Sequence, residues 1–295
     1  MGTDIGVQPG PGEIFLDHVG WFVPDLDLAA SVFGKLGFPL TPYIVHQNAD
    51  SDGSQKPSGT ANRCAMLERG YLEILTDVQG LDTPLTRAHR AALARYTGLH
   101  LIAFATGDLE NEAARLSRDG FSTQPVVNLR RPAPLDDGTE GEAAFSVLRV
   151  PPGAMEEGRI QFLTHLSPET VWQNSMVAKD NGITGLTGVV ICVRDPEAAG
   201  GRYARFTGRP YASGRIELDR GRLEFVDPDG LGRMLPGAVP PDLPFIAAAI
   251  LESADLARTC SALSAAGVTI HEPAVDTIAV GPADAMGAWV VIEAA

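Results

Sequence analysis

The chain has 295 residues, of which 44% are hydrophobic, so it is long and apolar enough to form a folded protein of two domains. Its formal net charge of −14, with basic residues scattered along the chain, excludes a protein that binds nucleic acid through clustered Lys and Arg. No apolar run approaches the ~20 residues of a membrane-spanning helix, and the three cysteines lie far apart without a CxxC pair, which excludes a disulfide framework or zinc knuckle and favours a cytoplasmic protein.

The first predicted element is an apolar strand that contains one histidine, His18, in the stretch FLDHVGWFVPD. Asp25 then suits the N-cap of an amphipathic helix that ends at Gly37. Three strand-like stretches follow, at residues 38–46, 60–68 and 70–76. The order strand, helix and three strands defines a βαβββ unit.

The same order returns three times along the chain. The second unit opens at residue 98, with Asp108 as the helix cap, and the third and fourth open at residues 186 and 244, the fourth being shortened. The Pro-, Gly- and acid-rich segment 129–142 is predicted as an exposed loop. Because one such unit cannot close its own sheet, the units should pair, which predicts an α+β fold of four tandem βαβββ modules in two domains.

The predicted organisation divides the chain into four parts. A flexible N-terminus at 1–12 precedes a metal-binding domain at 13–166, and a linker at 167–182 leads to a second, metal-free domain at 183–295.

Polar side chains recur at matching places in the first two units. Aligning DHVGWFVPD with LHLIAFATGD places His18 on His100, 82 residues away, and aligning GYLEIL with GRIQFL places Glu73 on Gln161, 88 residues away. If the units pair about a pseudo-two-fold axis, these four side chains converge. Each alone has a structural explanation, such as a core histidine, but together they favour an octahedral site for Fe, Mn, Co or Ni, with Zn less suited.

The second half of the chain does not repeat this set. Gly188 or Val189 stands at the position of His18, and the opening strand of the fourth unit is apolar around Ala247. Glu224 matches Glu73 but has no histidine partner, so we expect a structural ion pair there. The second domain is therefore predicted to serve as a scaffold, a lid or a dimer surface.

The stretches DHVGWFVPDLDLA, GTANRCAMLERGYLEIL and GRIQFLTHLSPETVW resemble the vicinal oxygen chelate superfamily, in its glyoxalase-like branch. The likeness covers most of the chain as architecture, but its motifs lie within residues 15–172. It implies four metal-ligand positions, occupied in strand order by His18, Glu73, His100 and Gln161. It also implies chemistry in which a metal binds neighbouring substrate oxygens and stabilises an enediolate or related oxyanion.

The superfamily includes several activities, so the fold alone does not identify the reaction and the residues of the site have to be considered. The leading hypothesis is a metal-dependent lyase or isomerase acting on a small molecule with vicinal oxygens. Glu73 would move the proton, because the amide of Gln161 has no useful pKa.

Two alternatives stay open. One is a non-haem Fe(II) dioxygenase of the extradiol type, with iron held by His18, His100 and Glu73 and with His46 or His165 as an additional catalytic histidine. We expect His165 to sit at the mouth of the site, two alternations beyond Gln161 on the same strand. The other is a non-catalytic protein that only binds a small molecule, as in drug resistance.

Four further residues are candidates for substrate binding. Asn62 and Arg63 are adjacent on a strand, so one of them should face the interior of the barrel, and Tyr71 shares the face of Glu73. Trp172 either covers the site or packs in the seam between domains. The sequence does not identify the substrate, and a homodimer remains open.

Overall fold

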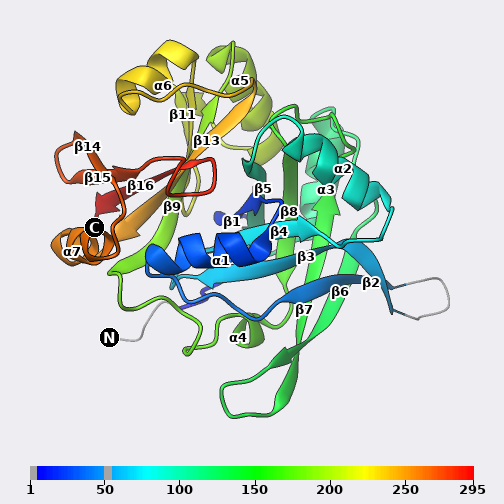
Figure 1. Ribbon diagram of the computed structural model, residues 1–295. Coiled ribbons are helices and arrows are strands. Elements are labelled where there is room, and N and C mark those ends of the chain that lie inside the picture. The colour runs from blue at the N-terminus through cyan, green and yellow to red at the C-terminus, as the bar shows by residue number, and fades with distance from the viewer. Residues whose placement is uncertain (1–4, 50–54) are drawn as a thin grey trace.

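The computed structural model describes residues 5–49 and 55–295, and within them the order strand, helix and three strands occurs four times (Figure 1). The first unit comprises β1 (Ile14–Phe22), α1 (Leu26–Lys35), β2 (Ile44–Ala49), β3 (Gln55–Met66) and β4 (Tyr71–Asp77). The second comprises β5 (Gly98–Thr106), α3 (Leu109–Arg118), β6 (Val127–Pro134), β7 (Glu140–Arg149) and β8 (Arg159–His165).

The third and fourth units complete the predicted architecture. The third comprises β9 (Ile183–Cys192), α5 (Pro196–Thr207), β10 (Tyr211–Ala212), β11 (Arg215–Glu217) and β12 (Arg222–Val226). The fourth comprises β13 (Phe245–Ser253), α7 (Leu256–Ala265), β14 (Ile270–Ala274), β15 (Thr277–Val280) and β16 (Trp289–Ala294). Further helices lie between units: α2 (Pro84–Leu93), α4 (Pro168–Val171) and α6 (Pro228–Met234). The α+β fold of tandem βαβββ modules is thus confirmed.

The main helix of every unit begins at an aspartate. The four N-caps are Asp25, Asp108, Asp195 and Asp255, and each carboxylate accepts a hydrogen bond from a backbone N–H of the first turn. These N–H groups have no partner inside the helix, so the cap fixes where each helix starts. None of the helices in the described residues combines the length and apolar character needed to cross a lipid bilayer.

The units pair through their opening strands. β1 runs antiparallel to β5, and β9 runs antiparallel to β13, while the first and last strands of each unit are parallel. β5 and β13 are joined only through Leu99 and Ile246, which links both pairs into one continuous sheet. Figure 1 shows the first pair, coloured blue to green, beside the second pair, coloured lime to red.

Each opening strand carries an extra residue that its partner strand does not match, eight positions before the N-cap of its unit. These bulged residues are Asp17, His100, Thr187 and Ala247, and β9 has a further unmatched residue, Thr184. A β-bulge turns nearby side chains in a new direction, and bulges are frequent beside active sites. Seven positions before the caps, the equivalent residues of the first two units are therefore His18 and Leu101.

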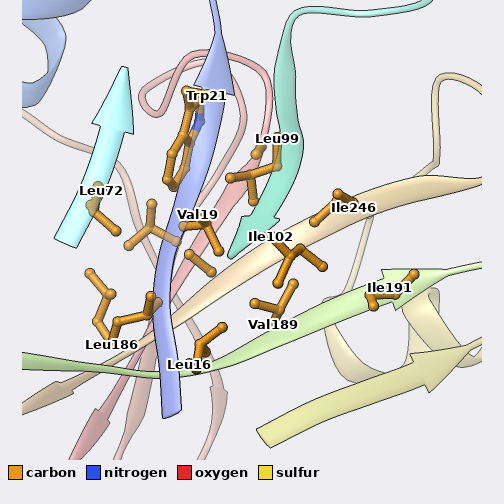
Figure 2. Packing of buried hydrophobic residues seen from close by; sticks show 14 of the residues in the cluster. Leu16, Val19, Trp21, Leu72, Leu99, Ile102, Leu186, Val189, Ile191 and Ile246 are labelled. Carbon is orange, nitrogen blue, oxygen red and sulfur yellow. The ribbon is translucent and has the colours of Figure 1, made fainter. Parts of the chain in front are cut away.

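One hydrophobic core extends through all four units. Figure 2 shows Val19 of β1, Val189 of β9 and Ile246 of β13 in the same cluster. The indole N–H of Trp21 also donates to the carbonyl of Ala285 at 3.0 Å, which connects the first unit to the fourth. Because the two halves share this core, the division into domains at 13–166 and 183–295 stays a prediction.

The segment 129–142 is not the exposed loop that its composition predicts. It forms most of a β-hairpin, in which β6 pairs with β7. Pro132 and Pro134 are tolerated because β6 pairs only with β7 and so lies at the edge of the sheet, where a missing N–H breaks no ladder. The hairpin contributes Arg131 and Arg149 to the cavity described below.

The segments predicted as a flexible N-terminus and as a linker both make hydrogen bonds where they are described. Residues 1–4 of the predicted flexible N-terminus lie outside the described residues, but the N–H of Gly6 donates to the carbonyl of Glu68 at 3.0 Å. In the predicted linker at 167–182, the indole of Trp172 donates to the carbonyl of Leu67 at 3.1 Å.

Candidate functional site

A cavity of about 130 Å³ lies between the first two units. Strands β1 to β4 of the first unit and β5 to β8 of the second contribute its walls. Six residues that the sequence predicts for the site line it: His18, His46, Asn62, Tyr71, Glu73 and Gln161. The pairing of the two units therefore brings most of the predicted site together.

His18 is held in one orientation by its neighbours. Its Nδ1 lies 2.7 Å from Oδ2 of Asp17, and its ring stacks on Tyr71 with centroids 4.4 Å apart. Because a carboxylate can only accept, the Nδ1–H of His18 donates to Asp17, and Nε2 is the ring nitrogen left for another partner. This Nε2 lies 3.6 Å from Oε2 of Glu73.

Asp17 joins two histidines from different strands. The bulge lets its other oxygen, Oδ1, accept a hydrogen bond from Nε2 of His165 at 2.9 Å. Burial alone would raise the pKa of Asp17, but the charge and hydrogen bonds of His165 and His18 outweigh burial and hold it well below its usual range. His165 is buried against Trp172, so the prediction that it sits at the mouth of the site is wrong.

Glu73 is positioned by an amide and faces a second imidazole. Nδ2 of Asn62 donates to Oε1 of Glu73 at 2.6 Å, and Nε2 of His46 lies 3.6 Å from the same oxygen. Nδ1 of His46 is 3.0 Å from the hydroxyl of Thr60, which fixes the ring. Burial lowers the pKa of His46, although the negative charge of Glu73 partly opposes the shift.

The second unit presents a different set of groups to the same cavity. Glu73 stands opposite Gly20 on the neighbouring strand, and Gln161 stands opposite Ala103, so the predicted match of Glu73 with Gln161 agrees with the register. Oε1 of Gln161 accepts a hydrogen bond from Nε of Arg149 at 3.3 Å. The amide oxygen therefore has one lone pair left for another partner.

The predicted match of His18 with His100 is wrong by one residue. His100 is the bulged residue of β5, equivalent to Asp17, while Leu101 stands at the position of His18 and lines the cavity. Nε2 of His100 bonds instead to the carbonyl of Tyr96 at 2.9 Å, and burial lowers its pKa to about 4. Counting back from the helix caps, which are 83 residues apart rather than 82, would have revealed the shift.

Two predicted substrate-binding residues do not line the cavity. Arg63 points to the face opposite Asn62, and its Nη1 donates to the carbonyl of Thr41 at 3.2 Å. Trp172 lies behind Tyr71, with ring centroids 5.9 Å apart, and packs against the first unit. Strand alternation explains the first outcome, because Asn62 and Arg63 cannot both face inward.

Four arginines of the second unit line the cavity and were not predicted from the sequence. They are Arg130 and Arg131 on β6, Arg149 on β7 and Arg159 on β8, and Arg130 forms an ion pair with Glu142. Arg159 could have been found, because it precedes Gln161 by two residues as Tyr71 precedes Glu73. Burial, together with the charge of Arg149, lowers the pKa of Arg159 to about 10, so it stays charged at neutral pH.

The second pair of units has no comparable constellation at the equivalent positions. The strand register places Gly188 where the first unit has His18, and Glu224 where it has Glu73. Glu224 accepts a hydrogen bond from Nε of Arg222 at 2.6 Å. The expected structural ion pair is present.

The donor atoms around Glu73 define what could hold a metal. No group of three or more His, Cys, Asp or Glu side chains in residues 5–49 and 55–295 is arranged to bind an ion. A site built here therefore needs the amide of Gln161 as a third donor beside His18 and Glu73. With Leu101 at the fourth position, the predicted quartet becomes a set of one imidazole, one carboxylate and one amide.

Solved structures share this fold at low sequence identity. A hypothetical protein from Staphylococcus aureus has a TM-score of 0.64 at 14% identity, covering 96% of this chain and 100% of that chain. A mutant of 4-hydroxymandelate synthase from Streptomyces coelicolor has a TM-score of 0.58 at 13% identity, covering 96% and 92%. A xylose isomerase-like TIM barrel/4-hydroxyphenylpyruvate dioxygenase fusion protein has a TM-score of 0.59 at 11% identity, covering 97% of this chain and 50% of the fusion protein.

The sequence comparisons agree with the architecture. A search of curated proteins found no match. The profile of the glyoxalase-like domain family, however, matches residues 16–207, which include both units of the candidate site. The chain therefore belongs to the glyoxalase-like domain family, within the vicinal oxygen chelate superfamily.

Proposed function

We propose that the protein is a divalent-metal-dependent enzyme of the lyase or isomerase type, acting on a small molecule with neighbouring oxygens. The observation that carries this proposal is the oriented pair of His18 and Glu73, whose Nε2 and Oε2 lie 3.6 Å apart. Asp17 holds the Nδ1 proton of His18, an arrangement that typically supports metal-bound histidines.

The spacing of His18 and Glu73 supports a shared ion. Two ligand atoms that each lie about 2.1 Å from a shared metal are roughly 3–3.6 Å apart at ordinary bond angles. His18 and Glu73 meet this requirement, and the free lone pair of Gln161 can supply a third bond. A mixed N/O set with open positions suits Fe, Mn, Co or Ni better than a closed four-ligand Zn site.

A bound divalent ion would act as a Lewis acid that stabilises an oxyanion on the substrate. The chain's own residues then supply the proton transfer. His46 has a lowered pKa and an Nε2 that faces the cavity, so at neutral pH it can accept a proton. Asn62 donates to Oε1 of Glu73 and keeps that carboxylate in place beside His46.

The geometry favours this chemistry over ring cleavage. The predicted iron ligands of a dioxygenase include His100, which bonds to the carbonyl of Tyr96 and does not line the cavity of about 130 Å³ that holds His18 and Glu73. His165, one of its candidate catalytic histidines, is buried behind Asp17. A binding protein without catalysis would need none of the oriented donors and is an outcome of the test below.

Metal binding is the direct test. Protein stripped of metal should bind one equivalent of Mn, Fe, Co or Ni per chain in calorimetric titration, and elemental analysis should find the ion retained. His18→Ala and Glu73→Gln should abolish binding, because each removes one of three donors. His100→Gln serves as the matched control and should leave the affinity unchanged. If the wild-type protein binds none of these ions, the proposal is wrong.

A further inference from the structure

The cavity is electrically divided between the two units. His18 and Glu73 lie on the side of the first unit, while Arg131, Arg149 and Arg159 come from the second. These three arginines are concentrated in one cavity of a protein whose net charge is −14. A substrate that enters this cavity therefore meets a local charge opposite to that of the whole protein.

Within the described part of the chain, Arg131, Arg149 and Arg159 form no ion pair with a carboxylate, and the nearest opposing charge that acts on Arg149 and Arg159 is that of Glu73 across the cavity. Nε of Arg149 donates to the neutral amide of Gln161, and the guanidinium of Arg159 lies 5.3 Å from the ring centroid of Phe22. By contrast, Arg115 and Arg222, also partly buried, each form ion pairs with glutamates. A partly buried cation without a counter-ion is costly, so an anion in the cavity would be favoured.

Two of these arginines also line a second, larger cavity. This space of about 790 Å³ shares Ser58, Leu85, Arg149 and Arg159 with the first cavity. Its other walls are largely apolar, with Phe22 and Ile160 among them. Arg149 and Arg159 thus stand where the two spaces meet.

We infer that the substrate is an organic acid whose carboxylate or phosphate binds Arg149 and Arg159, with an apolar body in the larger cavity. A guanidinium can hold either oxoanion through two parallel hydrogen bonds. The vicinal oxygens of the acid would then extend toward His18 and Glu73, a part of the inference that rests on the proposed function. The recognition of the acid group does not depend on a metal.

Binding of model acids to metal-stripped protein tests this inference. The probes are 2-naphthoate, 2-naphthyl phosphate and the neutral 2-naphthalenemethanol, titrated calorimetrically. Of the two acids, the one that binds more tightly should bind at least roughly 10-fold more tightly than the alcohol, because it gains charge-assisted hydrogen bonds. Its affinity should fall as salt is added. Whichever acid binds more tightly identifies the carboxylate or the phosphate as the preferred group.

Variants assign the binding to the two arginines. Arg149→Gln and Arg159→Gln should each lower the affinity for the more tightly bound acid by roughly 10- to 100-fold, without changing the affinity for the alcohol. Arg149→Lys and Arg159→Lys keep the charge, guard against loss of folding, and should give intermediate affinities. Arg233→Gln alters an exposed arginine on α6 and should bind like the wild type.

The outcomes separate this inference from the proposed function. His18→Ala should lose metal binding but keep acid binding, and Arg159→Gln should do the reverse. If metal binding fails while acid binding follows the arginines, only the proposed function is wrong. If no probe binds, if the alcohol binds as tightly as the acids, or if the Gln variants bind like the wild type, acid recognition is overturned.

Discussion

At the scale of single residues, the carboxylate of Asp17 organises the site. It is fully buried and bonds Nδ1 of His18 and Nε2 of His165, so both of its oxygens are used. A buried carboxylate is tolerated only when such partners replace water. His165, predicted as a catalytic residue, does not line the cavity; it contacts Asp17, which in turn contacts His18.

Replacing Asp17 with Asn should weaken metal binding by roughly 10- to 100-fold, because the amide no longer enforces the proton on Nδ1 of His18. The measurement is calorimetric titration of the folded variant, with circular dichroism to confirm its structure. Asp77→Asn is the control, since Asp77 pairs with Arg90 away from the cavity lining. Equal affinities of D17N and wild-type protein would contradict the orienting role.

His89 should make the protein lose stability in mild acid. It is buried against Phe22, and burial lowers its pKa to about 4. The unfolded chain, with an ordinary histidine pKa, binds more protons between about pH 6.5 and 4, so stability falls as pH falls through this window, by up to roughly 3 kcal/mol.

Urea unfolding at pH 7 and pH 5 measures this effect. His89→Gln removes the titrating group and should reduce the loss of unfolding free energy between the two pH values. The exposed His271 provides the control, because His271→Gln should leave the loss as large as in the wild type. An unchanged loss in H89Q would show that other groups cause it.

At the scale of elements, the helix cap and the strand bulge form a fixed frame in every unit. The caps were readable from the sequence, because an Asp before an amphipathic run satisfies the first-turn N–H groups locally. The bulges themselves were not readable, because an extra residue is defined only by the strand on the other side, although the 83 residues between the caps Asp25 and Asp108 reflect their effect. In β5 the extra residue is His100 itself, so Leu101 rather than His100 lines the cavity of the candidate site.

Removing a cap should test how much each unit contributes to the stability of the whole. In α5, Asp195 accepts a hydrogen bond from the N–H of Ala198 at 3.0 Å. Asp195→Ala should lower the free energy of unfolding by about 1 kcal/mol, whereas Asp195→Ser should retain most of it. Equilibrium urea denaturation measures both, and equal losses in the two variants would argue against the cap.

At the scale of the whole molecule, the two pairs of units share their interior. Val19 of the first unit and Ile246 of the fourth belong to one buried cluster, visible in Figure 2. A Cβ on Gly287 would lie 2.0 Å from the carbonyl oxygen of Thr97, so the backbone of the fourth unit approaches that of the segment before β5 very closely. The second half therefore packs directly against the first, while its role as a scaffold, a lid or a dimer surface stays a prediction.

The shared core predicts a single cooperative unfolding transition. Ile246→Ala should lower the unfolding free energy by ~2–5 kcal/mol, because it leaves a cavity in a fully buried place. Tryptophan fluorescence and far-UV circular dichroism should still follow the same transition, since Trp21 and Trp289 lie in different halves. Two separate transitions would show that the halves unfold independently.

The sequence by itself determined the repeated unit, the helix starts and six of the residues that line the cavity. These features can be predicted because helix caps, strand alternation and repeats depend on residues that are close together in the chain. Only the tertiary structure decided which side chains face one another across paired strands. That pairing set the bulges, excluded His100 from this cavity, placed Leu101 in its wall and gathered Arg131, Arg149 and Arg159 there. The physical reason is that a register between strands far apart in the chain is fixed by their mutual packing, which neither strand encodes alone.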